Sequence, residues 1–413
     1  MPVYDERFPY TSELEMPVIG LEAEFKTFID NKEALPEKVW RTPAGFVDRP
    51  LLKRTRKSMQ LPTGGALYFD GGVLEVVTPV IELAPQCTAR VVRSLWEQIE
   101  FVRNQLDAWE KRARHRIRLQ AFSCHINISF ELTREERGRD RTIQKLALLL
   151  AYLLPVPLIV VSANRRSTGI GVRPRRDRVE ITLDFTPDPG LMAATAALVV
   201  GIVRDVISWP SYRLEELQRR GTPLVAGVKP GKHATRKGWL TKDFHFRRNP
   251  FKTDLNAPAW QTNRGKMSLR DVALAVAMQF RGSIRRYADP FSDRLLFSVL
   301  RGETPSLLDL PDRPAAYDDV GRATRWGSVL PELQDFASLD EKLAPPWSGA
   351  GPTRSAYERV FLRLGERRRL RIGNEILTPV KVRGWYHSIF RTPGGEERML
   401  SIDQLLRNMG SWI

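Results

Sequence analysis

The chain has 413 residues, of which 42% are hydrophobic and 27% are charged, and this excludes a largely disordered protein because disorder requires low hydrophobicity. The length corresponds to about two to three domains, and the two cysteines, Cys87 and Cys124, are too few for a disulfide framework. Lysine and arginine outnumber aspartate and glutamate by 65 to 48, and the net charge of +17 favours an acidic or phosphate-bearing partner. No apolar run reaches the length of a membrane span, so we expect a soluble protein in the cytoplasm.

The first half of the chain alternates between strand and helix patterns. Residues 18–28 alternate apolar and acidic side chains, which predicts a strand. Residues 67–80 predict a hairpin that turns at Asp70-Gly71-Gly72. An apolar stripe with spacings of three and four predicts a long helix over 92–113. Further strands are predicted at 119–130 and 178–185, and further helices at 142–154, ending before Pro155, and at 191–207.

The patterns weaken after Trp209. Residues 221–263 are rich in proline, glycine, lysine and arginine, and we expect a long ordered loop or lid there. Residues 267–287 predict a helix. The remaining expectations are proline-rich connections over 302–352 with a short helix near 333–343, then a helix after Arg354, a hairpin at 392–395 and a helix at 401–409.

The alternating strands indicate an α+β fold with a curved, mainly antiparallel sheet that is lined with carboxylates and backed by helices. We expect three parts. Residues 1–210 form the catalytic core, residues 211–353 add a basic loop or lid and a helical region, and residues 354–413 form a small C-terminal α/β segment.

Common catalytic sequence motifs do not identify a function for this chain. The sequence contains no HExxH motif, no CxxC motif and no complete dinucleotide-binding fingerprint. Residues 227–233 resemble a phosphate-binding loop, but this stretch is one residue too short. It also has His233 where serine or threonine would bind magnesium.

Acidic residues lie in strands that have no structural need for them. Glu22 and Glu24 are two residues apart and therefore share one face of their strand. Glu75 lies in an otherwise apolar strand, where an isolated charge is costly to bury without a partner or a metal. The competing interpretation is that Glu22 and Glu24 form the solvent-exposed face of an edge strand.

Two later strands repeat this arrangement. His125, Asn127 and Ser129 share one face of their strand, and Cys124 lies on the opposite face and is interpreted as a core residue. A single histidine in such a strand is more often a core residue than a ligand. The last polar stripe consists of Arg178, Glu180, Thr182 and Asp184. Together the stripes predict one sheet face that binds several divalent cations through oxygen ligands.

The segments GLEAEF, LEVVTP, CHINIS and RVEITLD, in this order and spacing, resemble the glutamate–cysteine ligase and carboxylate–amine ligase family of the glutamine synthetase-like superfamily. The resemblance covers residues 17–210. It implies a glutamine synthetase-like catalytic domain and an ATP- and magnesium-dependent carbon–nitrogen ligase. Such an enzyme forms an amide or peptide bond through an acyl phosphate, and its two or three magnesium ions (manganese is an alternative) offset the charge of ATP.

The resemblance also implies roles for individual residues. Arg173 and Arg178 would clamp the phosphate or acyl phosphate, and two departures from the family pattern, Ser123 and Thr182, put substrate or activity in question. The implied metal ligands are Glu22, Glu24, Glu75, His125 and Glu180, and the implied nucleotide contacts are Glu24, Glu75, Asn127 and Arg178.

The implied partners are ATP, an amine and a carboxylate on a small molecule or peptide, and the net charge adds an acidic protein or carrier. A homo-oligomer is compatible with the sequence. Two alternatives stay open. One is a catalytically inert, nucleotide-binding relative. The other is a nucleic-acid-binding protein, which the aromatic residues among lysines and arginines at 239–246 would suit.

Overall fold

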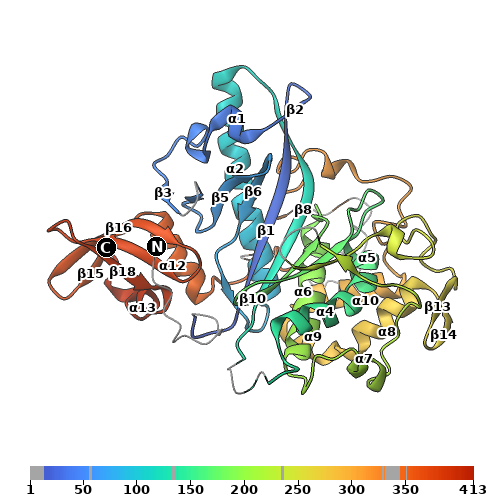
Figure 1. The fold of residues 1–413 in the computed structure, drawn as a ribbon. Coiled ribbons are helices and arrows are strands. Elements are labelled where there is room, and N and C mark those ends of the chain that lie inside the picture. Colours follow the sequence, from blue (N-terminus) through green and yellow to red (C-terminus); the bar gives the residue numbers. More distant parts are fainter. Residues whose placement is uncertain are drawn as a thin grey trace.

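One long sheet runs through the computed structural model, which describes residues 14–54, 58–132, 136, 138–233, 237–327, 330, 345–349 and 351–413. The strand order is β11-β12-β9-β10-β8-β1-β6-β5-β4-β3-β16-β17-β18, and β2, β7 and β15 pair beside this path (Figure 1). Among the described strands, every pairing in the sheet is antiparallel except that of β3 with β16. The expected α+β fold class is therefore confirmed.

The centre of the sheet consists of strands that the alternating sequence predicts. β1 (Val18–Ile29) pairs with β8 (Ile117–Ser129) on one side and with β6 (Val73–Val77) on the other. The edge-strand interpretation of Glu22 and Glu24 is therefore wrong. β5 (Ala66–Asp70) and β6 form the predicted hairpin, in which Gly71 (φ 58°) and Gly72 (φ 93°) adopt the left-handed backbone that the turn requires. β10 (Arg178–Leu183) pairs with β8.

Helices cover one face of this sheet. Alternate side chains of β1 and β8, among them Phe25 and Cys124, are fully buried there beneath α2 (Cys87–Ala113) and α6 (Pro189–Ile207). Removing each large apolar side chain from water contributes about 1.5–3 kcal/mol. α6 is long and apolar enough to cross a membrane, but 89% of its apolar window is buried inside the protein, so it serves here as a core helix.

The helical region departs from the sequence-based prediction in two places. α4 (Ile143–Leu153) ends before Pro155 as predicted, but Pro155 then begins α5 (Pro155–Ser162), because proline is well tolerated in a first helical turn. The single helix predicted over 267–287 is two helices, α8 (Leu269–Gln279) and α9 (Arg281–Tyr287), which meet at Phe280. The pattern analysis did not identify α10 (Pro290–Arg301), which Asp289 caps.

Residues 221–263 are not a simple loop. β11 (Gly231–Lys232) and β12 (Trp239–Thr241) extend the sheet beyond β9 (Ile170–Pro174), and these short strands lack a recognisable alternation. The remaining short elements are β2 (Lys32–Ala34), β3 (Leu52–Lys53), β4 (Met59–Gln60), β7 (Ile81–Glu82), β13 (Trp260–Thr262), β14 (Gly265–Met267), α1 (Pro36–Trp40) and α7 (Glu215–Arg219).

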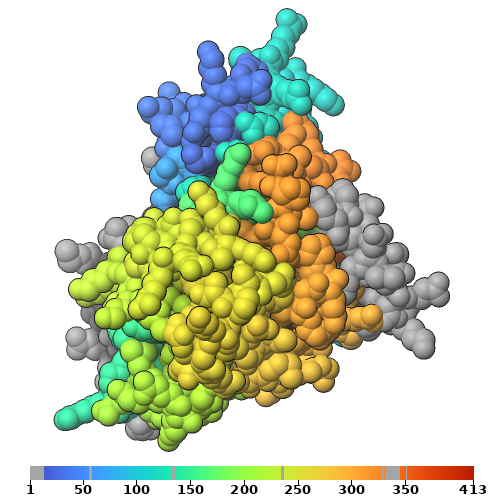
Figure 2. Space-filling model, turned by 90° about the vertical axis from the view of Figure 1, so that its right-hand side faces the viewer, coloured from blue at the N-terminus to red at the C-terminus, as the bar shows by residue number. Residues whose placement is uncertain are grey.

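Residues 302–327 run over the outside of the molecule with little regular structure. In Figure 2 this segment is orange and lies between the helical region and the N-terminal strands. The Val320 amide donates to the Leu119 carbonyl of β8, which fixes the segment to the sheet. The helix expected near 333–343 lies outside the described residues.

The C-terminal unit has a hydrophobic cluster of its own, centred on Tyr357, Phe361 and Phe390. A buried bidentate ion pair, with Arg93 Nη2 2.6 and 2.7 Å from the two Glu358 oxygens, ties this unit to α2. The predicted hairpin at 392–395 connects β17 and β18. The elements are α12 (Ala356–Gly365), β15 (Leu370–Ile372), β16 (Glu375–Arg383), β17 (His387–Arg391), β18 (Glu397–Ser401) and α13 (Ile402–Arg407).

Candidate functional site

The face of the sheet opposite α2 and α6 carries the predicted metal ligands and nucleotide contacts of β1, β6, β8, β9 and β10. Asp184 follows β10 and instead accepts hydrogen bonds from Asn164 and Ser167. Residues paired across antiparallel strands point to the same face, so the registers decide where each side chain lies. The registers that place these residues together are Glu22 with His125, Glu24 with Glu75, Glu180 with Asn127, Glu180 with Arg173, and Arg178 with Ser129.

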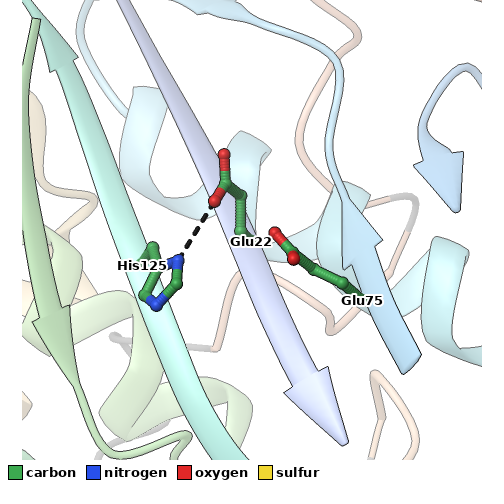
Figure 3. A group of neighbouring side chains, drawn as sticks. All are labelled: Glu22, Glu75 and His125. Atoms are coloured by element: carbon green, nitrogen blue, oxygen red, sulfur yellow. Dashed lines mark hydrogen bonds and ion pairs between the residues drawn. The ribbon is translucent and has the colours of Figure 1, made fainter. Parts of the chain in front are cut away.

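Glu22 of β1, Glu75 of β6 and His125 of β8 point toward one another from three neighbouring strands (Figure 3). Each offers one ligand atom, and these atoms lie within 4.8 Å of one another. His125 Nδ1 is 3.1 Å from Glu22 Oε2. Glu75 and His125 are only 2% and 8% exposed, so the cluster is shielded from bulk water.

The charge states in this cluster depend on one another. Burial disfavours a charged His125, but the hydrogen bond and charge of Glu22 outweigh it and raise the His125 pKa. Burial followed by the charge of Glu22 raises the pKa of Glu75 far above its ordinary value, so this carboxyl group holds a proton at neutral pH. Burial opposes the ionisation of Glu22, but the hydrogen bond and charge of His125 outweigh it and lower the Glu22 pKa. Two neighbouring carboxylates therefore share one negative charge unless a cation is bound.

Glu24 lies at the margin of this cluster. Its carboxylate accepts a hydrogen bond from Ser123, and its Oε1 is 3.8 Å from His125 Nε2. Tyr68 of β5 donates to Glu75. Ser123, one of the two departures named in the sequence analysis, therefore serves as a hydrogen-bond donor to a carboxylate.

Glu180 has different partners. Arg173 and Arg175 both form ion pairs with its fully buried carboxylate. The structure places Glu180 on the predicted face but outside the group of three potential ligands, and Arg173 Nη2 bridges the two regions at 3.4 Å from His125 Nε2. The guanidinium groups beside Glu180 therefore belong to Arg173 on β9 and to Arg175, which directly follows that strand. Thr182, the second departure named in the sequence analysis, contributes no charge here.

Arg178 and Asn127 occupy the end of the face near the C-terminal unit. Arg178 Nε donates to Asn127 Oδ1 at 2.9 Å, and its guanidinium carbon lies 4.8 Å from the centre of the Trp385 ring. A Cβ at Gly20 would lie 3.0 Å from the same ring, so glycine is required for this close approach. Among the described residues, the buried Asn127 Nδ2 has no hydrogen-bond partner.

The sequence analysis missed several residues of this site. Arg54 Nη2 donates to the Gly384 carbonyl at 3.0 Å, and Tyr386 donates to Asp177, so both hold the turn that carries Trp385. Nothing local in the sequence indicates that a turn of the C-terminal unit covers the sheet. Arg175 could have been found from the basic run at 173–176, which directly precedes the Glu180 strand.

The donor set suits a hard divalent cation. Carboxylate oxygens are the ligands that Mg2+ prefers, and a cation between Glu22 and Glu75 would offset the burial and the repulsion from Glu22 that together keep Glu75 protonated. Among the described residues, the buried Arg173 Nε and Asn127 Nδ2 have no hydrogen-bond partner. Both atoms are donors on the same face, so both are available to an anionic ligand.

Comparisons with known proteins support the fold. No protein-family model and no curated protein sequence matches this chain. A solved complex between the prokaryotic ubiquitin-like protein Pup and its ligase PafA is similar to it, with 12% identity, a TM-score of 0.51, and coverage of 96% of this chain and 92% of that chain. A structure of the Pup ligase PafA with ADP has 13% identity, a TM-score of 0.40, and coverage of 87% and 91%. The first likeness shows a glutamine synthetase-like fold over nearly the whole chain.

Proposed function

We propose that this chain is an ATP- and magnesium-dependent carboxylate–amine ligase. The observation that carries the proposal is the convergence of Glu22, Glu75 and His125 on a sheet face that also presents arginines. The glutamine synthetase-like fold supports it, and so does the named activity of the similar PafA, which is a ligase. Cytoplasmic location, the three-part domain division and the narrower glutamate–cysteine ligase assignment belong to the proposal too.

In this reaction a substrate carboxylate oxygen attacks the γ-phosphorus of ATP, the bond to the β–γ bridging oxygen breaks, and ADP leaves. The amine nitrogen then attacks the acyl carbon, phosphate leaves, and the nitrogen loses a proton. Bound magnesium would neutralise the phosphate oxygens and align the γ-phosphoryl group. No covalent nucleophile from the protein is needed.

The chain's own residues have distinct parts in this scheme. Glu22, Glu75 and His125 would hold a bound cation, with Glu24 at the margin. Arg173 and Arg178 present planar guanidinium groups that suit phosphoryl oxygens, and Glu180 fixes the orientation of Arg173 through a buried ion pair. Asn127 holds Arg178 and has a free amide donor for the nucleotide.

An acidic protein or carrier as the carboxylate substrate is part of the proposal. The net charge of +17 exceeds what a small substrate requires, and the similar PafA was solved in a complex with the small protein Pup. Electrostatic capture of such a partner weakens with salt, because screening acts over about 10 Å at 0.1 M ionic strength.

The test combines binding and isotope transfer. Thermal unfolding with a non-hydrolysable ATP analogue should show a stabilisation that requires Mg2+. For the substrate that stimulates phosphate release, a carboxylate labelled with 18O should transfer one labelled oxygen to phosphate. Release of unlabelled phosphate during amide formation would reject the acyl-phosphate route.

A nucleotide-binding relative without turnover is the second candidate. Two arginines neutralise Glu180, which the family resemblance assigns to a metal, so the site has fewer free carboxylates than that resemblance implies. The inert relative would bind the ATP analogue and release no phosphate with any carboxylate and amine pair.

A further inference from the structure

A second concave site lies on the C-terminal unit, away from the carboxylate cluster. Its volume is about 680 Å3, which is within the usual range of small-molecule sites. Four segments line it: β3 with the residue before it, the connection between α12 and β15, one face of β16, and the turn after β17. None of the lining residues belongs to the candidate ligase site.

The lining is basic and contains no acidic side chain. Lys53, Arg367, Arg369 and Arg391 all face this cavity. Arg391 is paired with Glu397 at 3.2 Å, but among the described residues no carboxylate forms an ion pair with the other three. These side chains are solvent-exposed, so water and salt screen part of the repulsion among the three uncompensated cations, and a bound anion would remove the rest.

The rest of the lining consists of apolar and hydroxyl groups. Leu51, Ile376 and Val380 provide apolar surface, and Thr378 and Thr392 provide hydroxyl groups. Arginine forks bind phosphate oxygens in a bidentate manner, and one phosphate group concentrates more negative charge than one carboxylate. The size and charge density of the cavity therefore favour a compact phosphorylated ligand over an extended acidic chain.

We propose that this cavity, lined by Lys53, Arg367, Arg369 and Arg391, binds a small ligand that carries a phosphate or diphosphate group beside an apolar part. The site is separate from the proposed ligase site and does not depend on it.

The experiment titrates the full-length protein with pyrophosphate and with phenyl phosphate by calorimetry, in magnesium-free buffer with EDTA. The Arg367→Gln/Arg369→Gln double variant should bind pyrophosphate at least tenfold more weakly than the unmodified protein. The matched control, Arg368→Gln/Arg371→Gln, removes the same charge from the same unit outside the cavity lining and should stay within twofold. Glu22→Gln should leave binding unchanged, which separates this site from the ligase site.

Lys53→Gln is a second cavity variant on a different segment, and it should also weaken binding if the double variant fails to fold. Phenyl phosphate should bind more tightly than inorganic phosphate, since the apolar lining contacts its ring. The proposal is overturned if pyrophosphate does not bind, or if the control loses as much affinity as the cavity variants. Tighter binding of poly-glutamate or of a single-stranded oligonucleotide at these same residues would overturn it as well.

Discussion

The polar face of the sheet has two halves, and each contains a buried glutamate with different charged neighbours. On β1, β6 and β8, Glu75 is surrounded by carboxylates and a histidine, and it is neutral because it retains a proton. On β9 and β10, Glu180 is ionised between Arg173 and Arg175. The first half holds a protonated carboxyl group whose proton a cation could replace, whereas the second half already pairs its carboxylate with two arginines and presents guanidinium groups to an anion. Residue type alone does not distinguish the two glutamates, but their neighbours do.

The largest expected effect is on catalysis in the first half. Glu22→Gln should lower ATP-dependent amide formation by at least about a hundredfold, because it removes the ionised ligand of the cluster. Phosphate release at saturating ATP and magnesium measures this effect. Glu33→Gln, an exposed carboxylate on the adjacent β2, is the control and should retain full activity.

In the second half of the face, the expected effect of a substitution is on the free energy of unfolding. Glu180→Gln should destabilise the fold by about 3–5 kcal/mol, since it leaves two arginines without their buried partner. Urea unfolding followed by circular dichroism measures the difference. A stability equal to that of the unmodified protein would show that water already compensates these arginines.

In the first half, the corresponding Glu75→Gln change should have little effect on the metal-free protein. Glutamine resembles the protonated carboxyl group, so the free energy of unfolding at pH 7 should change by less than about 1 kcal/mol. The rise in melting temperature on adding Mg2+ should disappear in this variant. A retained magnesium response would place the cation elsewhere on the face.

A pH-dependent effect concerns Asp184, which directly follows β10. Burial is the main cause that raises its pKa from the ordinary 3.8 to about 6. The folded protein therefore binds this proton more tightly than the unfolded chain, so stability falls as pH rises from about 4 to 6 and the penalty is complete above pH 6. In Asp184→Asn this part of the pH dependence should be absent. Unfolding curves at pH 4, 5, 6 and 7 provide the test, and parallel pH profiles for both proteins would contradict it.

Local patterns were sufficient to predict the centre of the sheet. The period-two alternation of β1, β8 and β10 places their polar side chains on one face without knowledge of the tertiary structure. The long helix was predicted to start at residue 92, but α2 begins at Cys87, and the Thr88 hydroxyl in this first turn donates to the Tyr287 carbonyl. The residues of the first turn of α2 are not apolar enough to extend the apolar stripe from which the helix was predicted.

The rest of the site depends on contacts between distant segments. The pairing of Arg173 with Glu180 requires β9, a strand of five residues with no predicted pattern. The ionic state of Glu75 depends on its burial in the folded sheet and on the charge of Glu22 on the neighbouring strand. A sequence pattern can therefore identify which face is polar, but the partner of each charge is decided only when the strands pair.

The contact of Trp385 with Gly20 has a consequence for how the protein is made. The sheet strands emerge early from the ribosome and can pair while the C-terminal unit is still being synthesised. Until the turn at 384–386 docks, the ring is absent from beside Arg178 and that end of the sheet face is open to water. The turn that covers this end of the sheet face therefore comes from a segment close to the end of the sequence given.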